Sequence, residues 1–492
     1  MRLPVLLRGA AKAAPPAAVV APTGTSRSSS TSSASCHGTL HAFRTRDITL
    51  RVPSKDHLLR VSFCSTRHLL AETIRRHDLL HSTGAHLSFL QLLGTQLTFA
   101  NLLASAQEGE ERVEVRFTAE EATILTEALA LGECRCYLRP EYNAQLVEQG
   151  LPPFPLRVNR VLYRQERPFS SLVHADLAEV LRPPPDTTHS ATTRDGAGES
   201  GEVPFSLCTP GMAERVPLEA WRSFFAYNTT IHAYNYLRRS DASVPAVWMH
   251  TSVNSRALRD AGLLAANGTD AHTAQRRLQP KGCAGGDTAT VAGAEEEEAL
   301  RRALPLSFGV VVTPLAAGAA VDRRVGHLNR ALSEAAALLC APRVGGGALA
   351  ASPLLPLLEK CADTHTTCQH VLSLVSGDHD GAYQAAVAAR QYSDDPATVA
   401  AVVQPIRRAL GVEDLVIPLE AEEQVRTGLD FFCRCSKQSI LDSLVSAPSS
   451  ALVSLRDAGG EVHCSFCGRT HCLTDGDWHT LETARPAPSP PS

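Results

Sequence analysis

Two pairs of cysteines near the C-terminus are the residues of this 492-residue chain best suited to chemistry. Cys433 and Cys435 form a C-x-C motif, and Cys464 and Cys467 form a C-x-x-C motif. The 28 residues between the pairs, 436–463, are enough for a small helical hairpin that returns the second pair to the first. Four thiolates around one point are the ligand set of a structural zinc ion, with Zn–S distances of about 2.3 Å. The spacing therefore predicts one zinc ion per chain.

The same spacing permits a second chemistry. Within each pair the sulfurs are near enough to form a disulfide once an oxidant displaces the metal, which would make the site a redox switch. Spacing alone does not separate a static zinc module from a switch, because both need the same four thiolates.

Three other cysteines are weaker candidates for metal binding or redox chemistry. Cys134 and Cys136 form another C-x-C motif, but they share one face of a predicted strand with Leu138, so we expect packed core residues. Cys472 is a fifth thiol near the second pair, and we expect it to be a bystander.

The elements that must position the cysteines have the pattern of an α+β protein. Residues 47–390 are predicted to form an α+β domain, interrupted by low-complexity insertions at 182–203 and 253–300. Apolar patterning predicts strands at 48–52, 58–63, 112–117 and 306–313, and helices at 66–80, 86–105 and 325–340, with part of 354–392 also helical. A short helix is expected at 217–225. Thr118 and Glu121 match a capping box, which predicts a helix from there to Leu131 that Gly132 ends.

The segment before the cysteines is predicted to be a linker, residues 391–430. Asp395 as N-cap and Pro396 at the first helical position predict a helix that ends at Gly411, followed by an acidic stretch. The cysteine domain is then expected at 431–480, and a disordered proline-rich tail at 481–492.

The first 46 residues have the composition of an organellar transit peptide. They contain six basic residues and a serine-rich run, and the first acidic residue is Asp47. This composition predicts import into the mitochondrial matrix, with the cytoplasm as the alternative. The uncharged run 303–321 contains two prolines and two glycines, so we expect a buried strand there and no membrane-spanning segment.

With the insertions set aside, residues 47–480 resemble the redox-regulated chaperone family called heat shock protein 33, or the 33-kDa chaperonin. The similarity is strongest at Phe-Cys-Arg-Cys-Ser, residues 432–436, and at Glu-Val-His-Cys-Ser-Phe-Cys, residues 461–467, which lie at the family's spacing. Weaker similarities are found at 56–60, 131–137 and 308–315. Where the family has a tyrosine and a phenylalanine after the second pair, this chain has His471 and Leu473.

The resemblance implies a holdase chaperone that uses no ATP and is not an enzyme. It implies that the reduced form binds zinc and is weakly active. Oxidation would then pair Cys433 with Cys435 and Cys464 with Cys467, release the zinc and unfold the linker. The protein would dimerise and bind unfolding client proteins. The chain has no Walker-type phosphate-binding motif, in keeping with this expectation.

Two other classes compete with the chaperone interpretation. A constitutive zinc-ribbon protein would bind nucleic acid or protein partners without switching. Residues 431–492 carry five basic and six acidic residues and no basic, aromatic-rich face, so we expect no nucleic-acid partner. A thiol oxidoreductase would place its C-x-x-C motif at the start of a helix. Here the motif follows a glycine turn and a short predicted strand, as in a zinc knuckle.

Overall fold

The computed structural model describes residues 46–77, 79–80, 87–119, 122–138, 155–163, 165, 167–173, 228–240, 244–261, 299–340, 355–364, 367–391 and 393–484. The chain divides between Cys433 and Arg434 into a larger unit, Thr45–Cys433, and a smaller unit that contains residues 434–492. Helices and sheets are mixed, and the predicted α+β class is confirmed.

A five-stranded antiparallel sheet forms the centre of the larger unit. Its order is β10 (Val425–Gly428), β1 (Ile48–Pro53), β2 (Leu59–Ser65), β9 (Leu306–Pro314) and β8 (Ala246–Ser252). The predicted strands at 48–52, 58–63 and 306–313 are confirmed. Strand β9 is buried along almost its whole length, which suits its run of three β-branched valines, 310–312.

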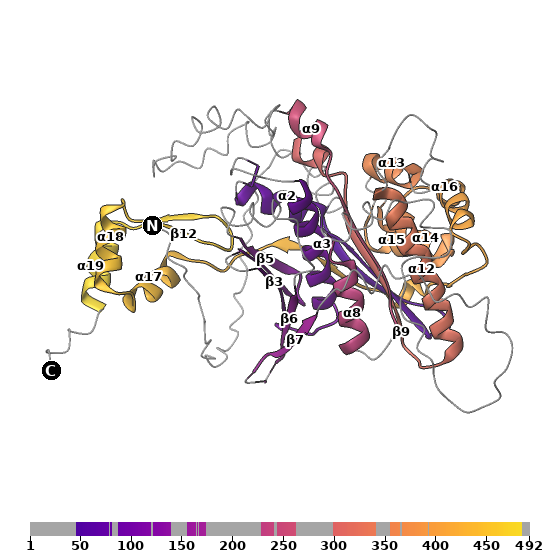
Figure 1. The fold of residues 1–492 in the computed structure, drawn as a ribbon, viewed down its shortest axis with the longest axis horizontal. Helices are drawn as coiled ribbons and strands as arrows, with labels where there is room; N and C mark the ends of the chain where they lie inside the picture. The colour runs from indigo at the N-terminus through magenta and orange to yellow at the C-terminus, as the bar shows by residue number, and fades with distance from the viewer. Residues whose placement is uncertain are drawn as a thin grey trace, which may run out of the picture. The chain divides into compact units, whose positions relative to one another are not determined.

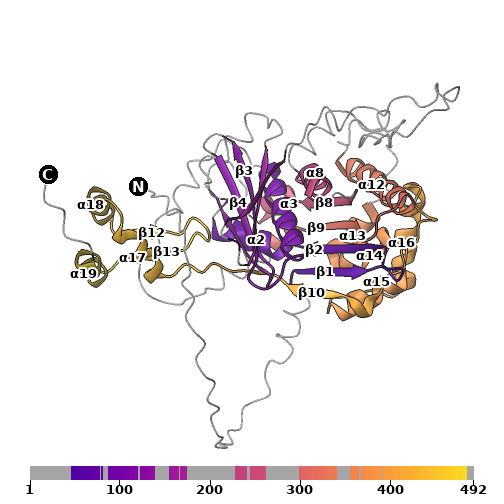
Figure 2. The same cartoon turned by 90° about the horizontal axis from the view of Figure 1, so that it is seen from below.

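A six-stranded sheet forms the second layer of this unit. Its order is β11 (Asp430–Phe431), β5 (Glu133–Tyr137), β4 (Ala122–Leu129), β3 (Arg112–Ala119), β6 (Leu156–Val161) and β7 (Phe169–Val173). Helix α3 (Leu87–Ala104) contacts strands of both sheets, and Figure 2 shows it lying between them. The backbone of β9 approaches α3 so closely that a Cβ at Gly309 would lie 2.5 Å from the Thr98 side chain, so this position requires glycine.

The predicted helix from Thr118 to Leu131 is wrong, because this stretch contains strand β4. Strand β4 is hydrogen-bonded to β3 on one side and to β5 on the other, and it buries Ile124, Thr126 and Ala128. Pairing with two neighbours overrides the local helix signal. Glu121, the second residue of the supposed capping box, lies outside the described residues.

Helices cover the face of the five-stranded sheet that is turned away from α3 (Figure 1). They are α12 (Ala319–Cys340), α13 (Leu355–Thr364), α14 (Thr367–Ser376), α15 (His379–Ala388) and α16 (Pro396–Ala409). The predicted N-cap is confirmed: the Asp395 carboxylate accepts from the backbone amides of Ala397, at 3.0 Å, and Thr398, at 3.4 Å. Two further helices, α2 (Arg67–Arg76) and α8 (Thr230–Ser240), complete the unit with the short α9 (Ser255–Asp260).

Several sequence predictions fall on residues that are not described. These are the transit peptide, the insertion at 182–203, the helix at 217–225 and most of the insertion at 253–300. Within the last of these, residues 255–260 form α9 and Leu258 is buried in the core, so this part of the chain is packed with the fold.

The segment that precedes the cysteines is attached to both sheets. Strand β10 pairs with β1, and β11 pairs in parallel with β5. The chain passes from one sheet to the other between two consecutive residues. The amide of Leu429 donates to the Asp47 carbonyl at 2.8 Å, and the amide of Asp430 donates to the Gly132 carbonyl at 2.9 Å. Gly132 has φ of +91°, and a Cβ there would lie 2.1 Å from the Gly428 carbonyl oxygen. Glycine at 132 is therefore required for this segment to lie against the sheet.

The smaller unit contains a helical hairpin, a β-hairpin and a final helix. The elements are α17 (Lys437–Val445), α18 (Ser449–Asp457), β12 (Glu461–His463), β13 (Thr470–Cys472) and α19 (Asp475–Ala484). The helical hairpin expected between the cysteine pairs is confirmed. The start of the tail at 481 is wrong, because α19 continues to Ala484 and buries Leu481. Among the described residues, no helix has both the length and the hydropathy that crossing a membrane requires.

Arg407 fixes the start of the linker to the helical layer. Its side chain is fully buried, and its guanidinium donates to the carbonyls of Leu374, Val412 and Leu415. Burial lowers its pKa to about 10, so it remains charged at neutral pH.

Replacing this arginine should therefore destabilise the larger unit. We expect Arg407→Met to lower the free energy of unfolding by about 3 kcal/mol, because buried carbonyls lose their donors. The matched control is Arg408→Met, since the Arg408 side chain is exposed and pairs with the exposed Glu413 at 3.5 Å; it should change stability by less than about 0.5 kcal/mol. Urea unfolding monitored by circular dichroism measures both, and equal effects of the two substitutions would contradict the assigned role.

Candidate metal centre

The four predicted cysteines lie together. The Sγ atoms of Cys433, Cys435, Cys464 and Cys467 are all within 4.8 Å of one another, and those of Cys435 and Cys467 are 3.4 Å apart. Four sulfurs bound tetrahedrally to one ion at about 2.3 Å would be about 3.8 Å from one another. The group therefore fits a metal ion that prefers thiolate ligands.

Local backbone geometry brings each pair to this point. Cys433 follows β11 after one residue, and Cys435 precedes Ser436, which caps α17 in a reciprocal box with Ser439. Cys464 and Cys467 form a tight turn between β12 and β13. There the amide of Gly468, with φ of +68°, donates to the Cys464 carbonyl at 2.8 Å. Cys467 is buried, whereas Cys433, Cys435 and Cys464 are half-buried, so three of the four residues are partly exposed to solvent.

The sequence analysis treated His471 only as a departure from the family pattern, yet it lies beside the group. Its Nε2 is 3.5 Å from Sγ of Cys435. It is in β13, directly opposite Val462 of β12, and is half-buried. The signal that could have found it is its position four residues after Cys467, a spacing typical of zinc ligands.

The sequence analysis also missed Arg135, which connects Cys433 to the six-stranded sheet. Arg135 lies on β5 and donates two hydrogen bonds to Glu127 of β4, at 2.9 and 3.0 Å. Burial alone would lower the pKa of Arg135, but the Glu127 carboxylate and the Cys433 sulfur outweigh it and raise that pKa. The residue before Cys433 is also bonded to this strand: the amide of Phe432 donates to the Cys134 carbonyl at 2.9 Å. Arg135 therefore stabilises an anionic sulfur at Cys433.

Cys134 and Cys136 lie in the core, as predicted. Both side chains are fully buried, with Asn101 donating to Cys134 at 3.4 Å and Thr126 next to Cys136 at 3.5 Å. Burial raises the pKa of Cys136 to about 12 and that of Cys134 well above its ordinary value. Cys472, in β13 opposite Glu461, is disulfide-bonded and is not a member of the four-cysteine group, so it is not the free thiol that the sequence suggested.

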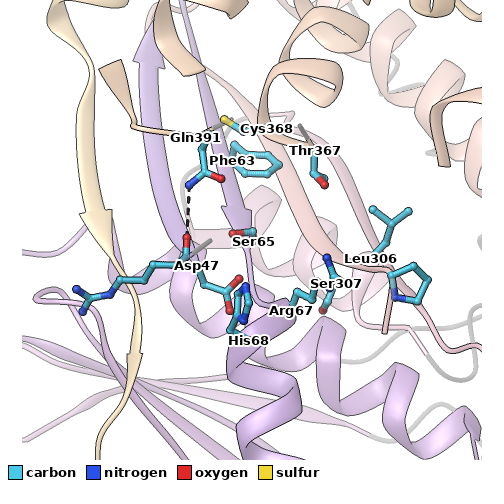
Figure 3. Close-up of a pocket in the computed structure, with 12 residues that line it drawn as sticks. Asp47, Phe63, Ser65, Arg67, His68, Leu306, Ser307, Thr367, Cys368 and Gln391 are labelled. Carbon is cyan, nitrogen blue, oxygen red and sulfur yellow. Dashed lines mark hydrogen bonds between the residues drawn. The ribbon is translucent and has the colours of Figure 1, made fainter. Parts of the chain in front are cut away.

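A small cavity in the larger unit is not a competing site. It has a volume of about 30 Å³, room for one or two water molecules, and lies beneath Asp47, Phe63, His68 and Gln391 (Figure 3). Burial raises the pKa of Asp47, whose carboxylate accepts from the backbone amide of Leu69 at 2.8 Å. The cavity is too small for an organic substrate, and its carboxylate is already hydrogen-bonded.

Comparison with known proteins points to one family. Residues 390–474 match the model of the Hsp33 protein family. This part of the chain is similar to that family. The match includes the linker helix α16, strands β10 and β11 and all four cysteines.

The chain is also similar to the crystal structure of the 33 kDa chaperonin (heat shock protein 33 homolog) from Thermotoga maritima. The identity is 14%, the TM-score is 0.45, and the alignment covers 89% of this chain and 98% of that one. No curated protein matches the chain.

The first test of the four-cysteine group concerns its ligands. Losing a residue that only supports a metal ligand costs roughly 10- to 100-fold in metal affinity. We expect Cys464→Ser to weaken metal binding by more than this, because the substitution removes a ligand atom itself. The control, Ser465→Ala, changes a residue of the same turn that is not a member of the group, and it should keep one metal ion per chain. Competition with a chromogenic chelator measures both affinities. An unchanged affinity in Cys464→Ser would remove this residue from the ligand set.

The second test separates the four grouped thiols from the buried ones. In reduced, metal-depleted protein at pH 8, iodoacetamide should modify Cys433, Cys435, Cys464 and Cys467. It should leave Cys134 and Cys136 unmodified, because a thiol with a pKa of about 12 is ionised to only about one part in ten thousand at that pH. Peptide mass spectrometry reads out each site. Modification of Cys136 as fast as Cys464 would contradict its assignment to the core.

Proposed function

We propose that this protein is a redox-regulated, ATP-independent holdase chaperone, which binds unfolding proteins after its zinc-bound cysteines are oxidised. One observation carries the proposal. The segment that pairs with the edges of both sheets ends directly at Cys433, the first member of the four-cysteine group. The match of residues 390–474 to the Hsp33 family supports it.

Zinc is the proposed metal, held by Cys433, Cys435, Cys464 and Cys467. The donor set consists of soft thiolates, which favour zinc over magnesium or calcium. A zinc ion bound there would supply on the order of 10 kcal/mol of folding free energy. The smaller unit needs such a contribution, because its own core is small: it buries Ile440, Leu441, Leu444, Leu452, Leu455, Leu473, Trp478 and Leu481.

Oxidation removes the ligands in a balanced reaction. An oxidant of the hypochlorous acid or peroxide class accepts two electrons for each disulfide formed, so two equivalents convert four thiolates into Cys433–Cys435 and Cys464–Cys467. Each pair is local in sequence and needs no large rearrangement. A disulfide sulfur carries no anionic lone pair for a metal, so the four ligands are lost together.

Loss of the Cys433 thiolate then loosens the segment before it. Arg135 loses an anionic partner at Cys433 and keeps its hydrogen bonds to Glu127. Strand β11, which makes only two residue pairs with β5, loses its anchor at the C-terminal end. Release of residues 425–431 would leave β1 and β5 as unpaired edges and uncover the apolar site of Leu429.

Unpaired strand edges beside apolar surface are what an unfolding polypeptide can bind. Extended segments of a client would add to the edges by backbone hydrogen bonds, and apolar side chains would add burial. The same edges would allow two oxidised copies to associate, which is the proposed homodimer. Neither mode of binding requires ATP or nucleic acid.

Oxidation should therefore switch the activity on. We expect hypochlorite-treated protein to suppress light scattering by a thermally unfolding client at near-stoichiometric ratios, and the reduced, zinc-loaded protein to suppress it several-fold less. Dithiothreitol plus zinc should reverse the gain. Equal suppression by the reduced and oxidised forms would favour a constitutive zinc protein that binds partners without switching.

We also propose that residues 1–46 direct the protein to the mitochondrial matrix, because they are basic, serine-rich and free of acidic residues. A fluorescent fusion of the full chain should co-localise with a matrix marker, and a fusion that lacks residues 1–46 should not. A full-length fusion that stays in the cytosol would contradict this proposal.

A further inference from the structure

The metal centre has a fifth donor atom next to one of its four sulfurs. The Nε2 atom of His471 is 3.5 Å from Sγ of Cys435. Two ligands on one tetrahedral ion, a sulfur at about 2.3 Å and an imidazole nitrogen at about 2.05 Å, would be about 3.6 Å apart. The observed separation of His471 Nε2 and Cys435 Sγ, 3.5 Å, therefore matches the separation expected for two neighbouring ligands of one zinc ion.

The position of His471 is set by the same hairpin that sets the second cysteine pair. Strands β12 and β13 enclose the turn of Cys464 and Cys467, and His471 pairs with Val462 across this hairpin. The other histidine of the hairpin, His463, is exposed, and its Nδ1 is engaged at 2.8 Å by the hydroxyl of Thr470. Of these two histidines, it is His471 that lies beside a sulfur of the group.

We propose that His471 is a reserve metal ligand, which takes the place of Cys435 when that thiolate is lost. The inference rests on the metal site of the proposed function and goes beyond its four-thiolate ligand set. Three thiolates and one imidazole are a normal ligand set for structural zinc, so the exchange keeps the tetrahedral geometry. Neutral imidazole replaces an anionic sulfur, which makes the site less negative by one charge.

This exchange makes the four cysteines unequal. Loss of Cys435 would leave a three-sulfur, one-nitrogen site. We expect loss of Cys464 or Cys467 to leave no such site, because the His471 imidazole lies at the Cys435 sulfur and is placed to replace that ligand. A site damaged at Cys435 alone would keep its metal and stay folded.

Cobalt(II) tests the proposal, because its absorption spectrum reports how many thiolates bind it. The reduced full-length chain is titrated with cobalt under anaerobic conditions in four forms: wild type, Cys435→Ala, Cys435→Ala/His471→Phe and Cys435→Ala/His463→Phe. We expect Cys435→Ala to bind one cobalt ion, with weaker charge-transfer absorption than wild type and ligand-field bands at shorter wavelength. The His471 double variant should bind more than about 10-fold more weakly than Cys435→Ala, and the His463 double variant should match Cys435→Ala.

Two further variants complete the test. His471→Phe alone should keep the wild-type four-thiolate spectrum, which shows that the substitution leaves the site folded; a changed spectrum would mean that His471 is already a ligand and would overturn the reserve role. Cys464→Ala should lose tight binding whether or not His471 is present. If wild type binds cobalt and Cys435→Ala does not, or if both double variants bind equally well, the reserve ligand is ruled out and the four-thiolate site stands. If wild type itself fails to bind, the metal site of the proposed function falls as well.

Discussion

The attachment of residues 425–432 to two sheets is the interaction on which the rest of the proposal depends. It consists of four residue pairs with β1, two with β5, and the amide of Phe432 bonded to Cys134. A net hydrogen bond contributes about 1 kcal/mol, and ordering a residue costs about 1–2 kcal/mol, so this pairing is marginal by itself. Burial of Leu429 and the anchor at Cys433 must supply the difference. The segment is therefore sensitive to the state of one sulfur.

The two ends of the linker are held by different chemistry. At its start, Arg407 donates to the carbonyls of Val412 and Leu415 from a fully buried position, and no oxidant changes that contact. At its end, Cys433 is held by its place among the thiols and by the charge of Arg135. Only the second anchor responds to oxidation. Release should thus begin at Cys433 and proceed back toward β10, with helix α16 remaining in the helical layer.

The sequence predicted what depends on local pattern and missed what depends on distant partners. Alternating apolar residues located β1, a continuous apolar run located β9, the Asp395–Pro396 signal located α16, and cysteine spacing located the metal centre. Strand β4 was predicted as a helix because its strand character comes from its neighbours β3 and β5. Residues Val425–Gly428 carry no apolar pattern that would predict their pairing with β1. Arg135 and His471 are recognised only once folding places them beside Cys433 and Cys435.

Amide hydrogen exchange of residues 425–432, compared between the reduced, zinc-loaded protein and the hypochlorite-oxidised protein, tests the central claim most directly. Buried amides of α16, such as those of Val399 and Val403, serve as the internal reference, because that helix should stay folded. The proposal predicts that oxidation raises exchange across 425–432 by at least about 10-fold, which corresponds to about 1.4 kcal/mol of lost protection, while the reference amides stay unchanged. Formation of both disulfides and loss of zinc without any rise in exchange at 425–432 would contradict it.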